Sequence, residues 1–147
     1  MPQPPPRNPT GEVIPHDNPE ILDGHNVIRR ISEKQIVTDA EGHRRISSIA
    51  FKPSSDANGG MSVDLEHFIE STGRDPRAFV TTPIWFGSVF FQAGTLRGER
   101  LQVGYDPIQG NEFHGEVWGV RTRAQSRRLQ ELAAWYVEIP DVQIAGA

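Results

Sequence analysis

Runs of apolar residues, some of them alternating with polar ones, predict five β-strands along the chain. The first run combines three apolar residues with Arg29 and Arg30, and the second is β-branched and aromatic at its ends. The third is strongly apolar, the fourth alternates between apolar and polar positions, and the fifth ends in an apolar stretch. The expected strands cover residues 25–31, 46–51, 88–93, 101–105 and 112–120.

Two segments in the first half of the chain carry helical signals. Ser32 followed by Gln35 has the spacing of a capping box, which predicts a short helix directly after the first strand. Within residues 61–73, apolar side chains recur at helical spacing, and Ser62 or Asp64 is a suitable N-cap. We therefore expect a helix over 61–73.

The strongest helical signal lies near the C-terminus, over residues 121–137. Its apolar positions follow the i, i+3, i+4, i+7 spacing of one helix face, so this segment is expected to close the domain as an amphipathic helix. Residues 94–100 predict a loose turn, and 74–87 fit a lid, a helix or a sheet edge equally well. The apolar face of the C-terminal helix consists of Leu129, Leu132, Ala133 and Tyr136.

The N-terminal stretch is rich in proline, which removes a backbone donor and fixes φ. We expect residues 1–20 to form a disordered tail, partly in the polyproline II conformation, either as a solvated leader or as a ligand for an aromatic groove. Residues 21–140 are expected to form a single domain, and 141–147 a flexible C-terminus. Because the strands are not separated by regular crossover helices, the fold class is α+β. The expected architecture is a mixed or split, mostly antiparallel sheet of about five strands with short helices and the C-terminal amphipathic helix.

Composition limits the functional classes. The 147 residues carry a net charge of −4 and no cysteine, which excludes disulfides, thiolate nucleophiles and sulfur-based zinc sites. Bulk charge gives no reason to expect a nucleic-acid binder. No apolar run approaches a membrane span, and no secretory signal is visible, so a bacterial-type cytoplasmic protein is the default expectation. Phosphate-binding loops, dinucleotide fingerprints, HExxH and GxSxG motifs are all absent from the sequence.

The stretch GNEFHGEVWGV places Glu112, His114 and Glu116 at alternate positions of the last expected strand. Alternate residues of a strand share a face, so the three side chains point the same way. They are nevertheless about 7 Å apart at each step, too far to bind one ion without a ligand from elsewhere. No metal is therefore expected. His114 and Glu116 are the candidate catalytic residues, and Glu112 is expected at the solvated start of the strand.

Further polar groups lie within the other expected strands. One of the adjacent residues Arg29 and Arg30 must point to each face of the sheet, and a buried guanidinium needs a carboxylate or a phosphate. Ser47 and Ser48 lie inside the second strand. Together with Glu116, these residues form a set that suits a nucleotide ligand.

In the order of its elements and polar positions, the segment 25–120 resembles the ADP-ribosyltransferase-like superfamily. The resemblance implies that Arg29 holds a dinucleotide and that Ser47 and Ser48 support the nicotinamide ribose. It implies that Glu116 stabilises an oxocarbenium ion, with His114 as its neighbour. The chain would then be a transferase with NAD as its substrate. The family's histidine-glycine-threonine pattern is missing from the first strand.

A second hypothesis is a non-catalytic interaction module, such as an accessory or toxin-neutralising protein with an unknown protein partner. The last helix begins with a cluster of arginines, which opposes the helix dipole and is not explained by folding alone. This cluster and the proline-rich tail would form the binding surface. Nucleic-acid binding through the same cluster is a third, weaker hypothesis, and membrane binding is not expected. The cluster consists of Arg121, Arg123, Arg127 and Arg128.

Overall fold

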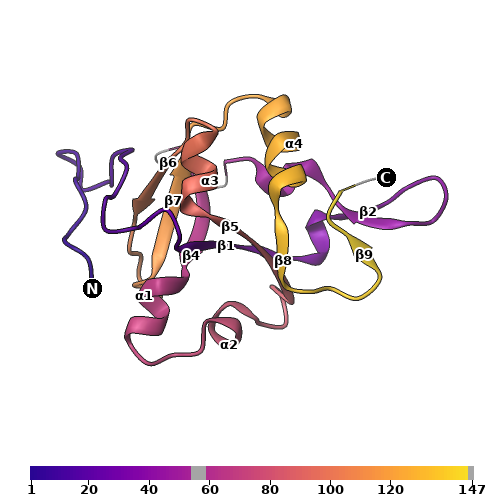
Figure 1. The fold of residues 1–147 in the computed structure, drawn as a ribbon, viewed down its shortest axis with the longest axis horizontal. Coiled ribbons are helices and arrows are strands. Elements are labelled where there is room, and N and C mark those ends of the chain that lie inside the picture. Colours follow the sequence, from indigo (N-terminus) through magenta and orange to yellow (C-terminus); the bar gives the residue numbers. More distant parts are fainter. Residues whose placement is uncertain (54–58, 146–147) are drawn as a thin grey trace.

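The computed structural model describes residues 1–53 and 59–145 and has two β-sheets with short helices packed around them (Figure 1). The large sheet has six strands in the order β6-β7-β4-β1-β5-β8, and every neighbouring pair is antiparallel. The predicted α+β class is confirmed, with one strand more in the main sheet than expected. The six strands are β1 (Asn26–Ile31), β4 (Met61–Leu65), β5 (Gly87–Gln92), β6 (Gln102–Tyr105), β7 (His114–Trp118) and β8 (Ala134–Val137).

The second sheet has three strands, ordered β2-β3-β9, and lies at the end of the molecule away from the N-terminus (Figure 1). Its strands are β2 (Ile36–Thr38), β3 (Arg44–Ile46) and β9 (Val142–Gln143). The helices are η1 (Glu33–Gln35) and η2 (Ser48–Phe51), both 3-10, with α1 (Glu66–Ser71), α2 (Pro76–Val80), α3 (Ala93–Gly98) and α4 (Arg123–Leu132). The predicted capping box of Ser32 and Gln35 is present at η1.

The strand β4 lies between β1 and β7 in the large sheet, and it corrects the helix predicted over 61–73. Met61, Val63 and Leu65 are buried at every second position, which is the period of a strand. Only the second half of the segment is helical, as α1. Ser62 and Asp64 are therefore strand residues facing away from this apolar row and not N-caps.

The strand predicted over 46–51 is also wrong. Strand β3 ends at Ile46, and residues 48–51 form the 3-10 helix η2. The cause is local hydrogen bonding, because the hydroxyl of Ser47 accepts from the backbone N–H of Ile49. Serine side chains compete in this way with a strand's backbone partners. The helix η2 packs against α4, where the hydroxyl of Ser126 donates to the carbonyl of Phe51.

The helix α4 is shorter than the 121–137 predicted for it. Thr122 and Gln125 form a capping box at its start, and the helix ends at Leu132. Ala133 is extended, and the following residues, AWYV, form the edge strand β8 against β5. Their aromatic and β-branched side chains favour a strand. Tyr136 therefore belongs to β8 and not to the helix stripe.

The two remaining segments of the domain are short helices. The unassigned stretch 74–87 contains α2, which begins with Pro76 after Asp75, whose carboxylate accepts from the N–H of Arg77. A proline at the first helical position needs no backbone donor there. The expected turn at 94–100 instead contains most of α3.

The proline-rich stretch, expected to be a disordered tail, makes contacts with the edge strand β6. The N–H of Asn18 donates to the carbonyl of Val103, and a carboxylate oxygen of Asp17 accepts from the N–H of Val103. Nε2 of His16 accepts from the N–H of Tyr105. These contacts satisfy backbone groups that an edge strand otherwise leaves unpaired.

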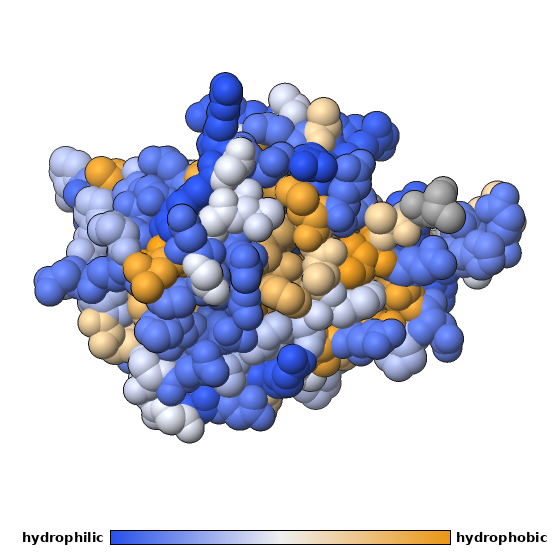
Figure 2. Space-filling model, viewed as in Figure 1, coloured by the Kyte–Doolittle hydropathy of each residue, from blue (hydrophilic) through white to orange (hydrophobic). Residues whose placement is uncertain are grey.

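The C-terminal segment, expected to be flexible, contributes β9, which pairs in parallel with β3. The serines, aspartate, asparagine and paired glycines of residues 52–60 predict a loop, and residues 54–58 of it lie outside the described residues, as do residues 146–147. The face seen in Figure 2 is largely hydrophilic, with hydrophobic residues exposed beside α4 and β8. Among the described helices, none has the length and apolar character needed to cross a membrane.

Candidate functional site

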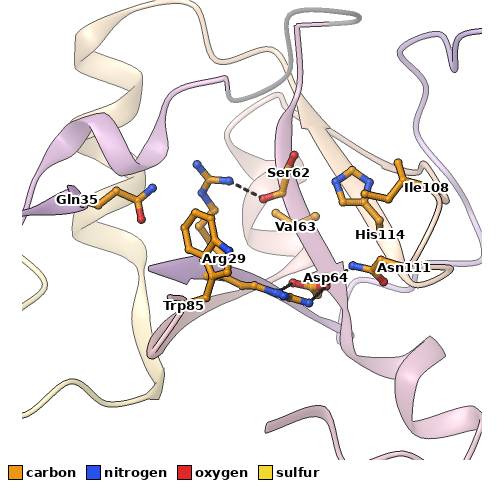
Figure 3. Close-up of a pocket in the computed structure, with 10 residues that line it drawn as sticks. Arg29, Gln35, Ser62, Val63, Asp64, Trp85, Ile108, Asn111 and His114 are labelled. Atoms are coloured by element: carbon orange, nitrogen blue, oxygen red, sulfur yellow. Dashed lines mark hydrogen bonds and ion pairs between the residues drawn. The ribbon is translucent and has the colours of Figure 1, made fainter. Parts of the chain in front are cut away.

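A cavity of about 360 Å³ lies against strands β1, β4 and β7 (Figure 3). Its size is within the usual range for small-molecule sites, and its wall mixes charged, amide and apolar side chains. Figure 3 shows Trp85 and Gln35 on one side of the site and His114, Asn111 and Ile108 on the other. The lining residues are Arg29, Arg30, Gln35, Ser62, Val63, Asp64, Trp85, Ile108, Asn111 and His114.

Strand register places a polar row along one face of β4 and β7. Ser62 lies opposite Glu116, and Asp64 lies opposite His114. Directly opposed residues of an antiparallel pair share a face, so all four side chains are on the side away from Met61, Val63 and Leu65. The large sheet therefore has a polar patch at its centre, and the cavity opens there.

Arg30 and Asp64 form the outer part of this patch. Nε and Nη2 of Arg30 donate to the two carboxylate oxygens of Asp64 at 2.8 and 3.0 Å. The side-chain amide of Asn111 donates to one of the same oxygens at 2.8 Å. The guanidinium of Arg30 also lies 5.5 Å from the ring centre of Phe79, within the range of a cation–π contact. This network fixes the orientation of the Asp64 carboxyl group and of one wall of the cavity.

Arg29 is buried, and it points to the face opposite that of Arg30, as the two adjacent arginines require. Its Nε donates to the carbonyl of Ala50 in η2 at 2.8 Å, and its Nη1 to the carbonyl of Ser62 at 2.8 Å. Burial lowers the pKa of Arg29 to about 10, and the nearby carboxylates of Glu116 and Asp64 oppose this shift. The side chain is still a cation at neutral pH, adjacent to the cavity.

His114 has a fixed ring orientation. Its Nδ1 lies 2.6 Å from the backbone carbonyl oxygen of Asp106, which can only accept, so the ring proton is assigned to Nδ1. Nε2 then carries the lone pair and lies 3.9 Å from a carboxylate oxygen of Glu116. An imidazole held in this way can accept a proton or bind a metal through Nε2.

Glu116 is 1% exposed, and its Oε2 has no hydrogen-bond partner within the described part of the chain. Burial raises the pKa of Glu116 to about 8, and the neighbouring carboxylate of Asp106 adds to the increase. Arg29 and the hydroxyl of Ser62 oppose it. Gly60 packs directly against the carboxyl group of Glu116, because a Cβ at Gly60 would lie 2.3 Å from Oε2.

Two of the predicted site residues, Arg29 and His114, line the cavity, and Glu116 does not line it but lies 3.9 Å from Nε2 of His114. Ser47 and Ser48 do neither, because the turn to η2 carries them away from the sheet. Ser47 caps η2, and Ser48 lines a separate cavity. The serine at the site is Ser62, which sequence reasoning assigned to a helix. Ser62 alternates with the apolar residues Met61 and Val63, and this period of two could have identified it as a strand residue.

Several cavity residues had no sequence signal of their own. Trp85 lies in the loop between α2 and β5, and Asn111 and Asp106 lie in the turn between β6 and β7. Asp106 is brought to His114 by the tertiary structure alone. Glu112 is exposed, as predicted for the solvated start of the strand, and its side chain does not line the cavity.

The arginines of α4 are all exposed. Arg121 and Arg123 line a separate cavity of about 560 Å³ together with Ser48 and Lys52. Arg128 pairs with Glu99 at 3.2 Å. At the start of this helix, the Thr122–Gln125 capping box satisfies the N–H groups of Thr122 and Gln125.

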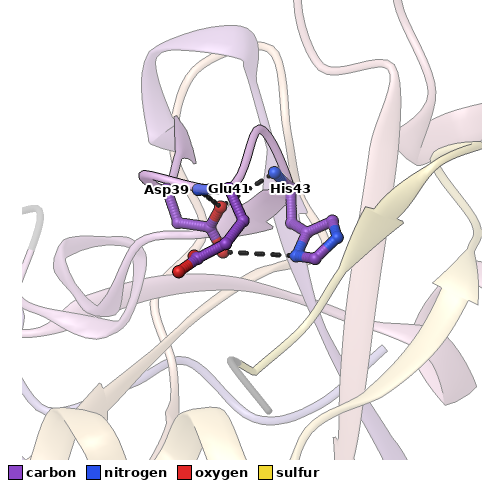
Figure 4. A group of neighbouring side chains, drawn as sticks. All are labelled: Asp39, Glu41 and His43. Atoms are coloured by element: carbon purple, nitrogen blue, oxygen red, sulfur yellow. Dashed lines mark hydrogen bonds and ion pairs between the residues drawn. The ribbon is translucent and has the colours of Figure 1, made fainter.

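A second group of carboxylates and imidazole lies in the turn between β2 and β3 (Figure 4). A carboxylate oxygen of Asp39 accepts from the N–H groups of Glu41 and His43, which lowers the pKa of Asp39. These hydrogen bonds form the turn itself, and the side chains of Glu41 and His43 are solvent-exposed. Turn formation accounts for this arrangement.

Comparison with known proteins identifies no relative of this chain. No family model matches it, and no curated protein or solved structure gives a significant match.

Proposed function

We propose that this chain is an enzyme that binds a nucleotide-type ligand in the cavity beside Arg29, with His114 and Glu116 at the reacting end. The observation that carries the proposal is that Arg29, from β1, and His114, from β7, line one cavity. The buried carboxyl group of Glu116 lies 3.9 Å from Nε2 of His114. A tautomer-fixed imidazole next to a buried carboxyl group is a suitable acid–base pair.

The walls of the cavity support this ligand class. Trp85 is half-buried and offers an aromatic surface on which a planar ring can stack. Asn111 and Gln35 add amide groups that can pair with ring edges or a ribose. The positive charge of Arg29 would attract an anionic group of a ligand bound in the cavity.

Transfer of an ADP-ribosyl group is a narrower version of the proposal. Arg29 and Glu116 would keep the roles that the family resemblance implies. The ribose-supporting serine would be Ser62, which lies opposite Glu116 on β4, and not Ser47 or Ser48. In its ionised form, the carboxyl group of Glu116 would stabilise positive charge that develops on the ribose. NAD is therefore the first ligand to test.

The test is thermal melting with millimolar NAD, ADP-ribose or ATP. Each ligand is measured once with a chelator and once with Zn²⁺, so that binding that requires a divalent ion is also detected. A ligand at a hundred times its dissociation constant stabilises the folded state by about 2.7 kcal/mol, which is easily detected. We expect an increase in melting temperature for the wild type and a much smaller one for Trp85→Ala.

Ile84→Ala is the matched control. Ile84 is in the same loop, is 69% exposed and does not line the cavity, so its replacement should leave the ligand-induced shift unchanged. The same shift in wild type and Trp85→Ala would place the ligand elsewhere. Absence of any shift under all these conditions would contradict the proposal.

An interaction module remains the second candidate function, because Arg121, just before α4, and Arg123 and Arg127 within it are exposed in a net acidic chain. The partner would be an acidic protein surface. Native electrophoresis with a polyglutamate peptide should show a complex that is lost when the three arginines are changed to glutamine. An unchanged mobility would exclude this binding mode.

A further inference from the structure

Asp106, His114 and Glu116 form a compact group beside the cavity, and His114 is the member of the group that lines it. One ring nitrogen and one oxygen from each carboxyl group lie within 4.8 Å of one another. His114 and Glu116 come from β7, where the strand spacing alone would leave them too far apart for one ion. Asp106, in the turn after β6, supplies the third ligand from outside the strand.

A second observation at this group points to a ligand. Oε2 of Glu116 is buried and has no hydrogen-bond partner among the described residues, while its Oε1 lies 3.9 Å from Nε2 of His114. A buried carboxylate oxygen without a partner is costly, and a cation next to it removes that cost. His114 is also oriented as metal-binding histidines are, because its other ring nitrogen donates to a backbone carbonyl.

We propose that Asp106, His114 and Glu116 bind one divalent transition-metal ion. Bonds of roughly 2.0–2.2 Å place the ligand atoms of one ion roughly 3–4.4 Å apart, so small side-chain rotations are enough to close the group. One nitrogen and two carboxylate oxygens suit Zn²⁺ or Mn²⁺ better than Ca²⁺ or Mg²⁺, which prefer oxygen alone. His114 lines the cavity, so a ligand in the cavity would reach the ion.

The ion would change the electrostatics of the proposed nucleotide site, and this consequence rests on the proposed function. When all three are charged, the carboxylates of Asp64, Asp106 and Glu116, in the cavity wall and beside His114, outnumber the guanidiniums of Arg29 and Arg30. A divalent ion reverses that balance and favours a phosphate-bearing ligand. Bound at the reacting end, it would polarise an oxygen of the substrate or activate a water molecule.

The experiment is calorimetric titration of the metal-stripped full chain with Zn²⁺ alone, without nucleotide. We expect one equivalent to bind, and we expect Asp106→Asn and Glu116→Gln each to weaken binding by about 10-fold or more, as loss of a charged ligand should. His43→Ala is the matched control, because it removes the imidazole of the exposed turn at Asp39 and should leave this binding unchanged.

Two results would overturn the proposal. One is the absence of stoichiometric Zn²⁺ binding by the wild type, which would mean that Asp106 and Glu116 share a proton in place of a cation. The other is binding that survives in Asp106→Asn and is lost in His43→Ala. Nucleotide binding is measured separately, so its failure would leave the metal result standing, and the reverse also holds.

A measurement on the wild type alone covers the case in which the variants fold poorly. The imidazole nitrogens of ¹⁵N-labelled histidines report metal coordination by large shifts. On addition of one equivalent of Zn²⁺, we expect Nε2 of His114 to shift while the nitrogens of His43 stay unchanged. A shift confined to His43 would contradict the assignment.

Discussion

Nδ1 of His114 lies 2.6 Å from the backbone carbonyl oxygen of Asp106, across the turn that joins β6 to β7. This single contact sets the tautomer of the imidazole and leaves Nε2 as its lone-pair atom. The same turn brings the carboxylate of Asp106 to the ring, with one of its oxygens 3.6 Å from Nδ1. Both the proposed acid–base role of His114 and the proposed metal site depend on this turn between β6 and β7.

Stability should depend on pH through Glu116. Its pKa is raised from 4.5 to about 8, so the folded state holds a proton that the unfolded state releases above pH 4.5. The free energy of unfolding should therefore fall as pH rises between these values. Glu116→Gln, which mimics the neutral form, should be more stable relative to wild type at pH 9 than at pH 4. Denaturant unfolding with a chelator present measures this.

The control for that measurement is Glu112→Gln. Glu112 is exposed on the same segment, so the difference in stability between this variant and wild type should be nearly the same at both pH values. A pH-independent effect of Glu116→Gln would contradict the idea that burial holds Glu116 neutral.

Gly60→Ala should destabilise the protein. A Cβ at this position would lie 2.3 Å from Oε2 of Glu116 and 2.9 Å from Nε1 of Trp118, and neither buried side chain can move away freely. Such overpacking typically costs about 1–3 kcal/mol. Urea denaturation measures the cost, and Gly24→Ala, where a Cβ would meet nothing within 4 Å, should be close to neutral. Equal stabilities of the two variants would contradict the packing around Glu116.

Arg29→Met should destabilise the fold even without any ligand. The change leaves the carbonyl oxygens of Ala50 and Ser62 without the donor that the guanidinium supplies, at about 1–3 kcal/mol for each buried group. Arg44→Met is the control, since its ion pair with Glu33 is largely exposed and is worth about 0.2–1 kcal/mol. Chemical denaturation that ranks the two variants equally would argue against a structural role for Arg29.

Asp17→Ala should cost more stability than Asp23→Ala. Both carboxylates bind Arg97, but only Asp17 also accepts from the N–H of Val103 at the edge of β6. Removing that acceptor should cost about 1 kcal/mol more. Thermal melting compares the two, and equal losses would mean that residues 16–18 do not stabilise the sheet edge.

The sequence predicted the elements whose signal is local. The first strand, the capping box after it and the strands β5, β6 and β7 lie within a few residues of their predicted ranges. Met61–Leu65 was misjudged because its apolar residues fit both periods when read together with Phe68 and Ile69. The serines of ISSIAF were misjudged because a hydroxyl–backbone bond turned the chain into η2.

The same distinction applies to the site. Arg29, His114 and Glu116 could be selected because polar groups inside strands stand out in a sequence. Asp106 and Asn111 could not, because their roles depend on how the turn before β7 folds over His114 and Asp64. Residues that act through tertiary contact alone leave no periodic signal.

The most direct test of the central claim is to map where a nucleotide binds. The backbone N–H shifts of the ¹⁵N-labelled chain should be followed during titration with NAD, with Zn²⁺ present. We predict saturable changes at Trp85, Ile108, Asn111 and His114. Changes centred on Ser48 and Arg123, at the separate cavity beside α4, or no changes at all, would contradict the account.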